Sequence, residues 1–446
     1  MNTPIADFVS RYAEREVSRF HMPGHKGVSF LGVEALDITE IDGADVLYGA
    51  DGIIAESEAN ATELFETAHT FYSTAGSSLS ICAMLALVSG DRKADARPVV
   101  LAARNVHRSF IHACALLDLD VEWIHPKEAE HLCSCAVDAD ALDGMLKEAD
   151  ALPCAVYVTS PDYLGQTADI ASIARVCHAH GVPLCVDNAH GAYLKFVTPS
   201  RHPITLGADL CADSAHKTLP VLTGGAYLHV SKNAAPAFVQ AARERLALFA
   251  STSPSYLILQ SLDLCNRYLA SDYPQRLSAC IERIERAKER ITSNGFSVLS
   301  SEPLKIVVCA ADGGYAGDEL AAHLRTHGVE AEFADATHLV LMITPETNER
   351  DFLRLEAAFD SVSTKAPIAI AIPALSQGER VMTIRQAILA PHETVLLENA
   401  LGRVCASPTV SCPPAIPIAV SGERITEDTV NIMKHYGFDS VCVVKE

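Results

Sequence analysis

The chain has 446 residues, of which 49% are hydrophobic and 20% are charged, and its formal net charge is -21 at pH 7. This composition is typical of a globular protein and excludes a disordered chain. The negative charge argues against binding to nucleic acid or to an anionic membrane, because both need a basic protein surface. We find no signal peptide and no apolar run long enough to span a membrane, and the scattered cysteines favour the reducing cytoplasm.

Residues 1–45 are expected to form an N-terminal arm, which contains the motif HMPGHKG at 21–27. His21, His25 and Lys26 of this motif could take part in catalysis. A Pro-Gly turn that seats the arm against a partner subunit explains the motif equally well, and we favour this structural role. The motif is not a Walker phosphate loop, because the preceding strand and the Gly-Lys-Ser/Thr ending are absent.

The major domain is expected at 46–295, where short apolar runs alternate with amphipathic stretches. The runs predict buried strands at 97–103, 154–160, 182–189 and 208–215, and the stretches predict helices at 77–90, 108–119 and 169–181. This alternation predicts an α/β fold with a mostly parallel central sheet covered by helices on both faces. Ligands of such sheets bind beyond the carboxyl ends of the strands.

The pattern of the chain changes after residue 250. Residues 250–295 predict a long helix, and 296–362 predict a smaller α+β domain in the order strand, helix, strand, strand, helix. A linker at 363–367 then leads to a C-terminal domain at 368–446, which is rich in proline and short strands. His131, Cys133 and Cys135 faintly resemble a metal site, but no second ligand cluster accompanies them, so we expect no metal.

Two residues of the major domain suggest a cofactor. Lys217, in DSAHKTLP, lies between segments that are predicted to be buried, and a lysine shielded from water can attack a carbonyl group. Asp187 is predicted to end a buried strand, where it can face Lys217 across a crevice. This pair suits pyridoxal 5'-phosphate (PLP), because the lysine can form a Schiff base while the aspartate keeps the pyridinium nitrogen protonated.

A phosphate site is predicted in STAGSSLS, at 73–80. Gly76, Ser77 and Ser78 open a predicted helix there, and the N–H groups and hydroxyls at a helix N-terminus bind phosphate well. A single serine at such a position is more often a plain helix cap. The order of the three features in an alternating α/β chain nevertheless favours PLP.

In these residues and in the motifs around them, the chain resembles the Orn/Lys/Arg decarboxylase family of PLP enzymes, in the short form without an N-terminal wing domain. The matching motifs run in family order over nearly the whole chain: FHMPGHKG (20–27), DITEIDGADVL (37–47), ARNVHRS (103–109), TSPDYLGQTADI (159–170), VDNAHGA (186–192), DSAHKTLPVLTGGAYLH (213–229), STSPSYLILQSLD (251–263) and CPPAIPIAVSGERI (412–425). The resemblance implies the type I fold of PLP-dependent transferases, the aspartate-aminotransferase type.

The resemblance also implies a role for individual residues. Lys217 would be the Schiff-base lysine, Asp187 the partner of the pyridinium nitrogen, and His107 the ring-stacking histidine with Ala189 on the other face of the ring. The remaining implied cofactor contacts are Ser77, Ser78, Ser214 and His216 at the phosphate, Ser160 near the ring hydroxyl, and Thr252 and Ser253 reaching the phosphate of a neighbouring subunit. A homodimer or higher oligomer with shared active sites would follow.

The implied reaction is loss of the α-carboxylate of a basic amino acid as carbon dioxide, with Lys217 or His216 as the proton donor. Arginine, lysine and ornithine all stay open as substrates, with a preference for arginine. Transamination, another lyase reaction and an inactive regulatory homologue are the alternatives. Cys412, Ala415 and the pair Gly224–Gly225 depart from the usual family pattern, which bears on the substrate and not on the cofactor.

Overall fold

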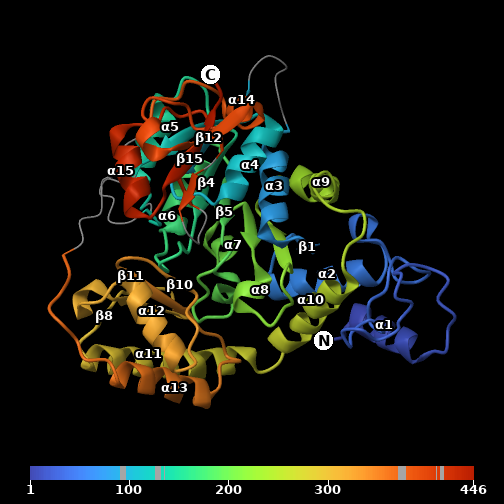
Figure 1. Cartoon of the computed structure of the whole chain (residues 1–446). Helices are drawn as coiled ribbons and strands as arrows, with labels where there is room; N and C mark the ends of the chain where they lie inside the picture. The colour runs from blue at the N-terminus through green and yellow to red at the C-terminus, as the bar shows by residue number, and fades with distance from the viewer. Residues whose placement is uncertain (91–96, 126–131, 135, 370–377, 408, 412–415) are drawn as a thin grey trace. The chain divides into compact units, whose positions relative to one another are not determined.

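The computed structural model describes residues 1–90, 97–125, 132–134, 136–369, 378–407, 409–411 and 416–446 (Figure 1). The chain forms two compact units whose segments alternate along the sequence. The first unit comprises Met1–Ala94, Cys154–Tyr157 and Ile170–Gln275, and the second comprises Asp95–Pro153, Val158–Asp169 and Arg276–Glu446. Within the described ranges, no helix has the length and apolarity that crossing a membrane requires.

A seven-stranded sheet has the strand order β1-β7-β6-β5-β4-β2-β3. Its strands are β1 (His69–Ser73), β2 (Val99–Ala103), β3 (Asp120–Ile124), β4 (Ala155–Thr159), β5 (Leu184–Asp187), β6 (Leu210–Asp213) and β7 (Ala226–Val230). Strands β5 and β6 are parallel, whereas β7 is antiparallel to β6 and β1. Because both faces of the sheet are covered, β5, β6 and β7 are buried along their whole length. The predicted α/β sheet is confirmed.

Eight helices of the first unit carry or surround its strands: α1 (Pro4–Glu14), α2 (Ile53–Phe65), α3 (Gly76–Val88), α6 (Ile170–Ala179), α7 (Pro203–Leu206), α8 (Ala215–Thr218), α9 (Pro236–Ala247) and α10 (Tyr256–Leu269). Short 3-10 turns lie at Leu47–Gly49 and Ala192–Lys195. Helix α3 is apolar on nearly every side and nine of its 13 residues are buried, so protein surrounds it.

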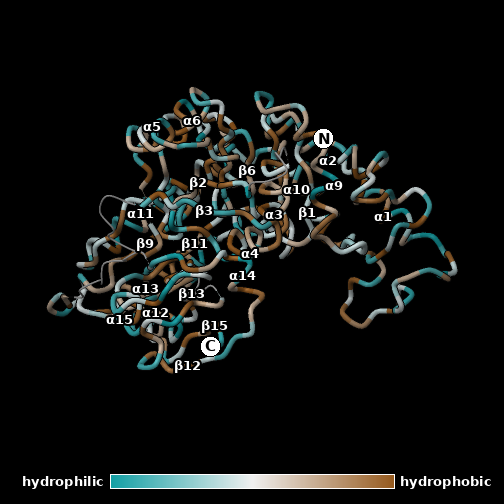
Figure 2. Tube along the Cα trace, turned by 90° about the horizontal axis from the view of Figure 1, so that it is seen from above, coloured by the Kyte–Doolittle hydropathy of each residue, from teal (hydrophilic) through white to brown (hydrophobic). Residues whose placement is uncertain are grey.

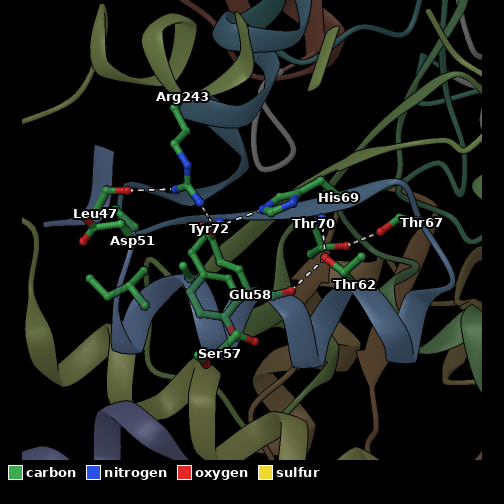
Figure 3. Close-up of polar contacts among 12 residues, drawn as sticks. Leu47, Asp51, Ser57, Glu58, Thr62, Thr67, His69, Thr70, Tyr72 and Arg243 are labelled. Carbon is green, nitrogen blue, oxygen red and sulfur yellow. Dashed lines mark hydrogen bonds and ion pairs between the residues drawn. The ribbon is translucent and has the colours of Figure 1, made fainter. Parts of the chain in front are cut away.

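Glu58 of α2 joins three elements of the first unit (Figure 3). Its buried carboxylate accepts hydrogen bonds from Arg243 of α9, from His69 Nε2 at 3.1 Å and from the Tyr72 N–H of β1 at 3.0 Å. Arg243 also donates to the carbonyl oxygen of Leu47 at 3.0 Å. Loss of Arg243 would leave the buried Glu58 charge without its arginine partner, so this cluster holds α2 and α9 against β1.

The segment that follows α1 exposes large apolar side chains. Phe20, Phe30 and Leu31 are 96%, 78% and 86% exposed, and apolar stretches are visible along this part of the trace in Figure 2. Within HMPGHKG, His25 Nε2 lies 3.3 Å from a carboxylate oxygen of Asp37 of the same arm. This contact within the arm favours the structural role of the motif.

The stretch 250–295 forms two helices, α10 (Tyr256–Leu269) and α11 (Tyr273–Ser293), so the prediction of one long helix was wrong. Pro274 explains the break, because it lies in the first turn of α11. A proline has no N–H to bond to the preceding turn, and its ring clashes with that turn inside a helix. The sequence pattern around it is helical on both sides, which concealed the boundary.

The second unit contains α4 (Arg108–Leu117), α5 (Ala139–Glu148) and a four-stranded antiparallel sheet in the order β10-β11-β9-β8. The strands of this sheet are β8 (Ser297–Val298), β9 (Lys305–Cys309), β10 (Phe333–Ala334) and β11 (His338–Met342). Helix α12 (Gly317–Thr326) lies between β9 and β10, and α13 (Glu349–Asp360) follows β11, so the order agrees with the prediction except for the additional strand β8. The expected domain boundaries at 45, 295 and 362 stay predictions.

The C-terminal part of the second unit consists of short elements: α14 (Ile384–Leu389), β12 (His392–Leu396), a 3-10 turn (Leu397–Asn399), β13 (Thr409–Ser411), β14 (Ile416–Ala419), α15 (Glu427–His435) and β15 (Ser440–Val444). Strand β12 pairs with β15, and β13 pairs with β14. Buried Arg104, just after β2, donates to the carbonyl oxygens of Pro417 (3.0 Å) and Ile418 (3.2 Å). These bonds attach β14 to the end of β2.

Candidate active site

Asp187 is the last residue of β5, and only 2% of its surface is exposed. Its Oδ1 accepts a hydrogen bond from the Ala189 N–H, and its Oδ2 accepts one from the Tyr157 hydroxyl, each at 3.2 Å. Burial raises the pKa of Asp187, while the nearby Lys217 ammonium and the two donors oppose the rise. The site therefore places a carboxyl group in a dry environment, where its interaction with a cation is strong.

Lys217 lies on α8, the four-residue helix that follows β6. Its Nζ is 3.0 Å from Nε2 of His190, which is buried. The Lys217 N–H donates to the Ser214 carbonyl oxygen at 3.0 Å, and the His216 N–H donates to the Gly225 carbonyl oxygen at 3.2 Å. These bonds attach α8 to the residue before β7, and Lys217 lies near enough to Asp187 to act on its pKa.

The predicted phosphate site lies at the N-terminus of α3. Ser77 is 2.7 Å from Ser214, oxygen to oxygen, so two of the predicted phosphate ligands meet although they are far apart in the sequence. No described side chain caps this end of α3, and Gly76 has a φ of +71°. The exposed side chain of Ser78 follows in the first turn. The N–H groups of a first helical turn and two hydroxyls make this end of the helix suitable for an anion.

Gly224 and Gly225, two departures from the usual family pattern, have a structural explanation. The Gly224 carbonyl oxygen accepts the Gly76 N–H at 2.8 Å and so fixes the start of α3. Gly224 has a φ of +100°, and a Cβ there would lie 3.1 Å from the Thr74 carbonyl oxygen. A Cβ on Gly225 would lie 2.2 Å from a methyl carbon of Val221. Both positions therefore need glycine.

The other predicted residues of the first unit all come after β5 in the sequence. Ala189 follows Asp187 and is partly buried. His216 Nδ1 lies 3.0 Å from the Gly225 carbonyl oxygen. Thr252 and Ser253 are exposed and precede α10. Exposure of these two residues is what contact with a second subunit would require.

His107 and Ser160 belong to the second unit. His107 caps the N-terminus of α4, where its Nδ1 lies 2.8 Å from the Ser109 hydroxyl and accepts the Ser109 N–H at 3.2 Å. Ser160 follows β4 and is buried, and its hydroxyl oxygen accepts the Ala168 N–H at 3.0 Å. Their predicted roles at the cofactor ring stay predictions. Cys412, Ala415, His131 and Cys135 lie outside the described residues.

A cavity of about 570 Å³ lies within the second unit, next to the ends of β2 and β4. Its lining includes Asn105, Thr159, Asp162 and Asp169. Asp162 accepts hydrogen bonds from the Ser134 hydroxyl at 2.7 Å and from the Gln166 N–H at 2.9 Å, and burial raises its pKa. The cavity thus contains two carboxyl groups and no basic side chain among its described lining residues.

Comparison with known proteins decides the family. Residues 3–308 match the Orn/Lys/Arg decarboxylase major domain, and residues 371–439 match the C-terminal domain of the same family. The chain belongs to the Orn/Lys/Arg decarboxylase family. It is therefore a member of a family of PLP-dependent decarboxylases, and the predicted resemblance is confirmed.

Curated relatives match over nearly their full length. The chain is 30% identical to the uncharacterized protein YaaO of Bacillus subtilis, over 96% of this chain and 93% of that protein. It is 29% identical to proteins named arginine decarboxylase from Halalkalibacterium halodurans and from Bacillus subtilis, in each case over 96% of this chain and 92% of the relative.

Solved structures confirm the fold. The constitutive lysine decarboxylase of E. coli superposes with a TM-score of 0.79 at 17% identity, covering 100% of this chain and 82% of that chain. The Francisella novicida lysine decarboxylase has a TM-score of 0.78 at 16% identity, covering 99% and 79%. A serine palmitoyltransferase of S. paucimobilis with bound PLP has a TM-score of 0.53 at 16% identity, covering 69% and 75%. The predicted type I fold is therefore confirmed.

The residues present in the first unit fit PLP. Asp187 offers a buried carboxylate for a cationic ring nitrogen, Lys217 offers an amine for an aldehyde, and the start of α3 offers hydroxyls for a phosphate. His190 and Tyr157 are the two contacts of this site that were not predicted. His190 lies within the motif VDNAHGA, which could have signalled a role, whereas Tyr157 lies in the apolar strand β4 and carries no such signal.

Proposed function

We propose that this protein removes the α-carboxylate of a basic amino acid, with PLP as its cofactor. When bound, PLP would withdraw the electron pair that the departing carboxylate leaves on the α-carbon. The observation that carries the proposal is the placement of buried Asp187 beside Lys217, whose Nζ lies 3.0 Å from His190. Family membership supports the same reaction.

The roles of the residues follow from their surroundings. Lys217 would hold the cofactor, and Asp187 would keep a ring nitrogen cationic, because a carboxylate without water interacts strongly with a cation. Ser77, Ser214 and Ser78 would bind the phosphate at the start of α3. His107, Ala189 and Ser160 keep the ring contacts that the resemblance implies.

A proton must return to the α-carbon after carbon dioxide leaves. We propose Lys217 as its donor, because Nε2 of His190 lies within hydrogen-bond distance of Nζ and can exchange a proton with it. His216 is the less favourable donor. Its Nδ1 is held by the Gly225 carbonyl oxygen, which fixes the ring, so only Nε2 could serve.

For the substrate, we propose arginine ahead of lysine and ornithine. Two relatives at 29% identity are named arginine decarboxylase, which favours arginine, whereas the lysine decarboxylase structures share only the fold. The net charge of -21 attracts any cationic substrate.

The test is direct. The purified protein is incubated with PLP and with arginine, lysine or ornithine in separate reactions, and mass spectrometry follows the products. We expect one amino acid to lose the mass of carbon dioxide, with Lys217→Ala as the inactive control. A keto acid product would instead show that the protein catalyses transamination and not decarboxylation. No product from any of the three would favour the inactive homologue.

We also propose that the active protein is a homodimer or a larger assembly with shared sites. Thr252 and Ser253 are exposed, and so are the apolar residues Phe20, Phe30 and Leu31 of the N-terminal arm. Exposed apolar side chains of this size are typical of surfaces that a partner covers. A second copy of this chain would bury these apolar side chains. Thr252 and Ser253 of the first copy would then lie near the phosphate site of the second copy.

A further inference from the structure

Asp213, at the end of β6, is fully buried and accepts four hydrogen bonds. Its Oδ1 accepts from Asn188 Nδ2 at 2.7 Å and from the Cys211 thiol at 3.3 Å. Its Oδ2 accepts from His202 Nε2 at 2.9 Å and from His229 Nε2 at 3.1 Å. The proposed reaction gives this carboxylate no role, and the motif around it did not suggest one.

The protons of the cluster follow from the outer contacts of the two histidines. The Ile204 N–H donates to His202 Nδ1 at 3.3 Å, so the proton of neutral His202 lies on Nε2, which faces Asp213. Thr70 Oγ1 lies 2.9 Å from His229 Nδ1 in the same arrangement. Burial lowers the pKa of His229, while the nearby Asp213 carboxylate opposes this shift. Asp213 is thus an ionised acceptor surrounded by donors.

A metal site is the alternative explanation. One ligand atom each of His202, Cys211 and Asp213 lies within 4.8 Å of the others, a spacing that a metal ion could use. A metal would need the lone pair of Nε2 of His202, but the Ile204 N–H already occupies Nδ1 and so places the proton on Nε2. The cluster is therefore a hydrogen-bonded hub.

The hub reaches the active site through Asn188, the neighbour of Asp187. The Asn188 N–H donates to the Ala212 carbonyl oxygen at 2.9 Å, and its own carbonyl oxygen accepts the Gly191 N–H at 2.8 Å. A Cβ on Gly191 would lie 2.0 Å from Asn188 Oδ1, so the side chain fits closely under the turn. This turn, residues 187–191, also carries His190, which contacts Lys217.

We propose that Asp213 is a positioning residue: through Asn188 it fixes the turn at 187–191, and with it the places of Asp187 and His190 relative to Lys217. Asp187 and Lys217 have these roles only under the proposed function, on which this inference therefore rests. The side-chain partners of Asp213 are Asn188, Cys211, His202 and His229, and none of these four residues is assigned to the substrate or to PLP. It acts by removing the freedom of a backbone turn that carries two functional side chains.

The test compares Asp213→Asn and Asn188→Ala with Asp209→Asn. Asp209 is a matched control, because it is a buried aspartate just before β6, at the opposite end of the strand, and it accepts the Leu184 N–H (2.8 Å) and His178 Nε2 (2.9 Å). Amide hydrogen exchange is followed in the full chain, with and without PLP, for the peptide that covers 187–193. We expect exchange there to rise at least about tenfold in the first two variants and to change by less than about twofold in the control.

Kinetics supply the second measurement. In Asp213→Asn and Asn188→Ala we expect kcat to fall at least about tenfold with KM within about twofold, because a displaced turn impairs the reacting geometry more than binding. Unchanged exchange at 187–193 in folded Asn188→Ala overturns the proposal, and this variant decides if Asp213→Asn does not fold. Exchange without PLP does not depend on the reaction, so a failure of the proposed function would be recognised separately.

Discussion

Two buried aspartates on neighbouring strands differ in pKa because their surroundings differ. Asp187 ends β5 and Asp213 ends β6, and both are almost wholly shielded from water. Burial raises the pKa of Asp187, which has only two donors. Burial acts on Asp213 as well, but two imidazoles and their hydrogen bonds hold its pKa well below the usual range. A cationic group beside Asp187 would therefore stabilise its ionised form, and the ring nitrogen of a bound cofactor could supply that charge.

Lys217 carries the first prediction. The protein loaded with PLP should be yellow, with an absorption band at about 420 nm, because the cofactor is bound covalently to an amine. Reduction with borohydride should then fix the cofactor to the peptide that contains Lys217, as peptide mapping would show. Lys195, a lysine of the same unit, is the control and should stay unlabelled. A label on Lys195 or on any other lysine would contradict the assignment of Lys217.

Asp187 carries the second prediction. Asp187→Asn keeps the size of the side chain and removes its charge, so we expect the fold to persist and kcat to fall at least about a hundredfold, as on loss of a strong electrostatic stabiliser. Steady-state kinetics measure the loss, and circular dichroism checks the fold. Near-normal turnover in the folded variant would show that Asp187 does not face the ring nitrogen.

At the scale of elements, α1 is attached to the first unit by a side chain of another helix. Asp263 of α10 is fully buried, and its Oδ2 accepts the N–H groups of Ile5 and Ala6, in the first turn of α1, each at 2.9 Å. Its Oδ1 accepts the Ser57 hydroxyl of α2 at 2.6 Å. Burial raises the pKa of Asp263 to about 6, and these donors oppose the rise. One carboxyl group therefore joins three helices.

The raised pKa predicts how stability depends on pH. Because the folded-state pKa is about 6 and the unfolded-state pKa is close to the model-peptide value of about 3.9, the folded state holds the proton more tightly between them. The stability that this group contributes is fully present below pH 4 and is lost as the pH rises through 6. The loss should amount to about 2–3 kcal/mol, at about 1.4 kcal/mol per pKa unit.

Urea unfolding of the PLP-free protein from pH 4 to 7 measures this term as the difference between wild type and Asp263→Asn. The matched control is Asp272→Asn, which removes an exposed carboxylate between α10 and α11 that accepts the Ser271 hydroxyl at 3.2 Å. We expect the control to keep the wild-type dependence on pH. Identical pH profiles for wild type and Asp263→Asn would refute the raised pKa.

At the scale of the whole molecule, the open question is how many chains build one active site. Thr252 and Ser253 lie exposed in front of α10, in the segment that the family resemblance assigns to the phosphate of a neighbouring subunit. If the assignment holds, the protein is at least a two-fold dimer with an interface of more than about 2,000 Å², as obligate dimers have. Analytical ultracentrifugation should then find no active monomer.

Subunit mixing tests the shared site. The double variant Thr252→Ala/Ser253→Ala retains Lys217 and should lose PLP more readily, whereas Lys217→Ala is inactive. In a mixed dimer, one site combines Lys217 of the first chain with Thr252 and Ser253 of the second. Random exchange in equal amounts should restore about a quarter of wild-type activity, since half of the dimers are mixed and each has one intact site. No recovery after demonstrated exchange would contradict shared sites.

From the sequence alone, the alternating α/β pattern and the family could be predicted, and both are confirmed, whereas the functional pair Lys217 and Asp187 stays a prediction. Strand and helix patterns depend on residues near one another in the chain, so β2, β4, β5 and β6 and helices α3, α4 and α6 could be predicted. Where local signals were mixed, as around Pro274, the pattern failed and two helices looked like one.

Only the tertiary structure decided which distant residues meet. His190 lies at Lys217, Ser77 meets Ser214, and Asp213 binds Asn188, His202 and His229, because β1, β5, β6 and β7 are neighbours or near neighbours in the sheet. Strand order follows from how the whole chain buries its apolar surface, and no short stretch of sequence encodes that choice. Lys217 could therefore be proposed from its motif, but the side chains that contact it could not.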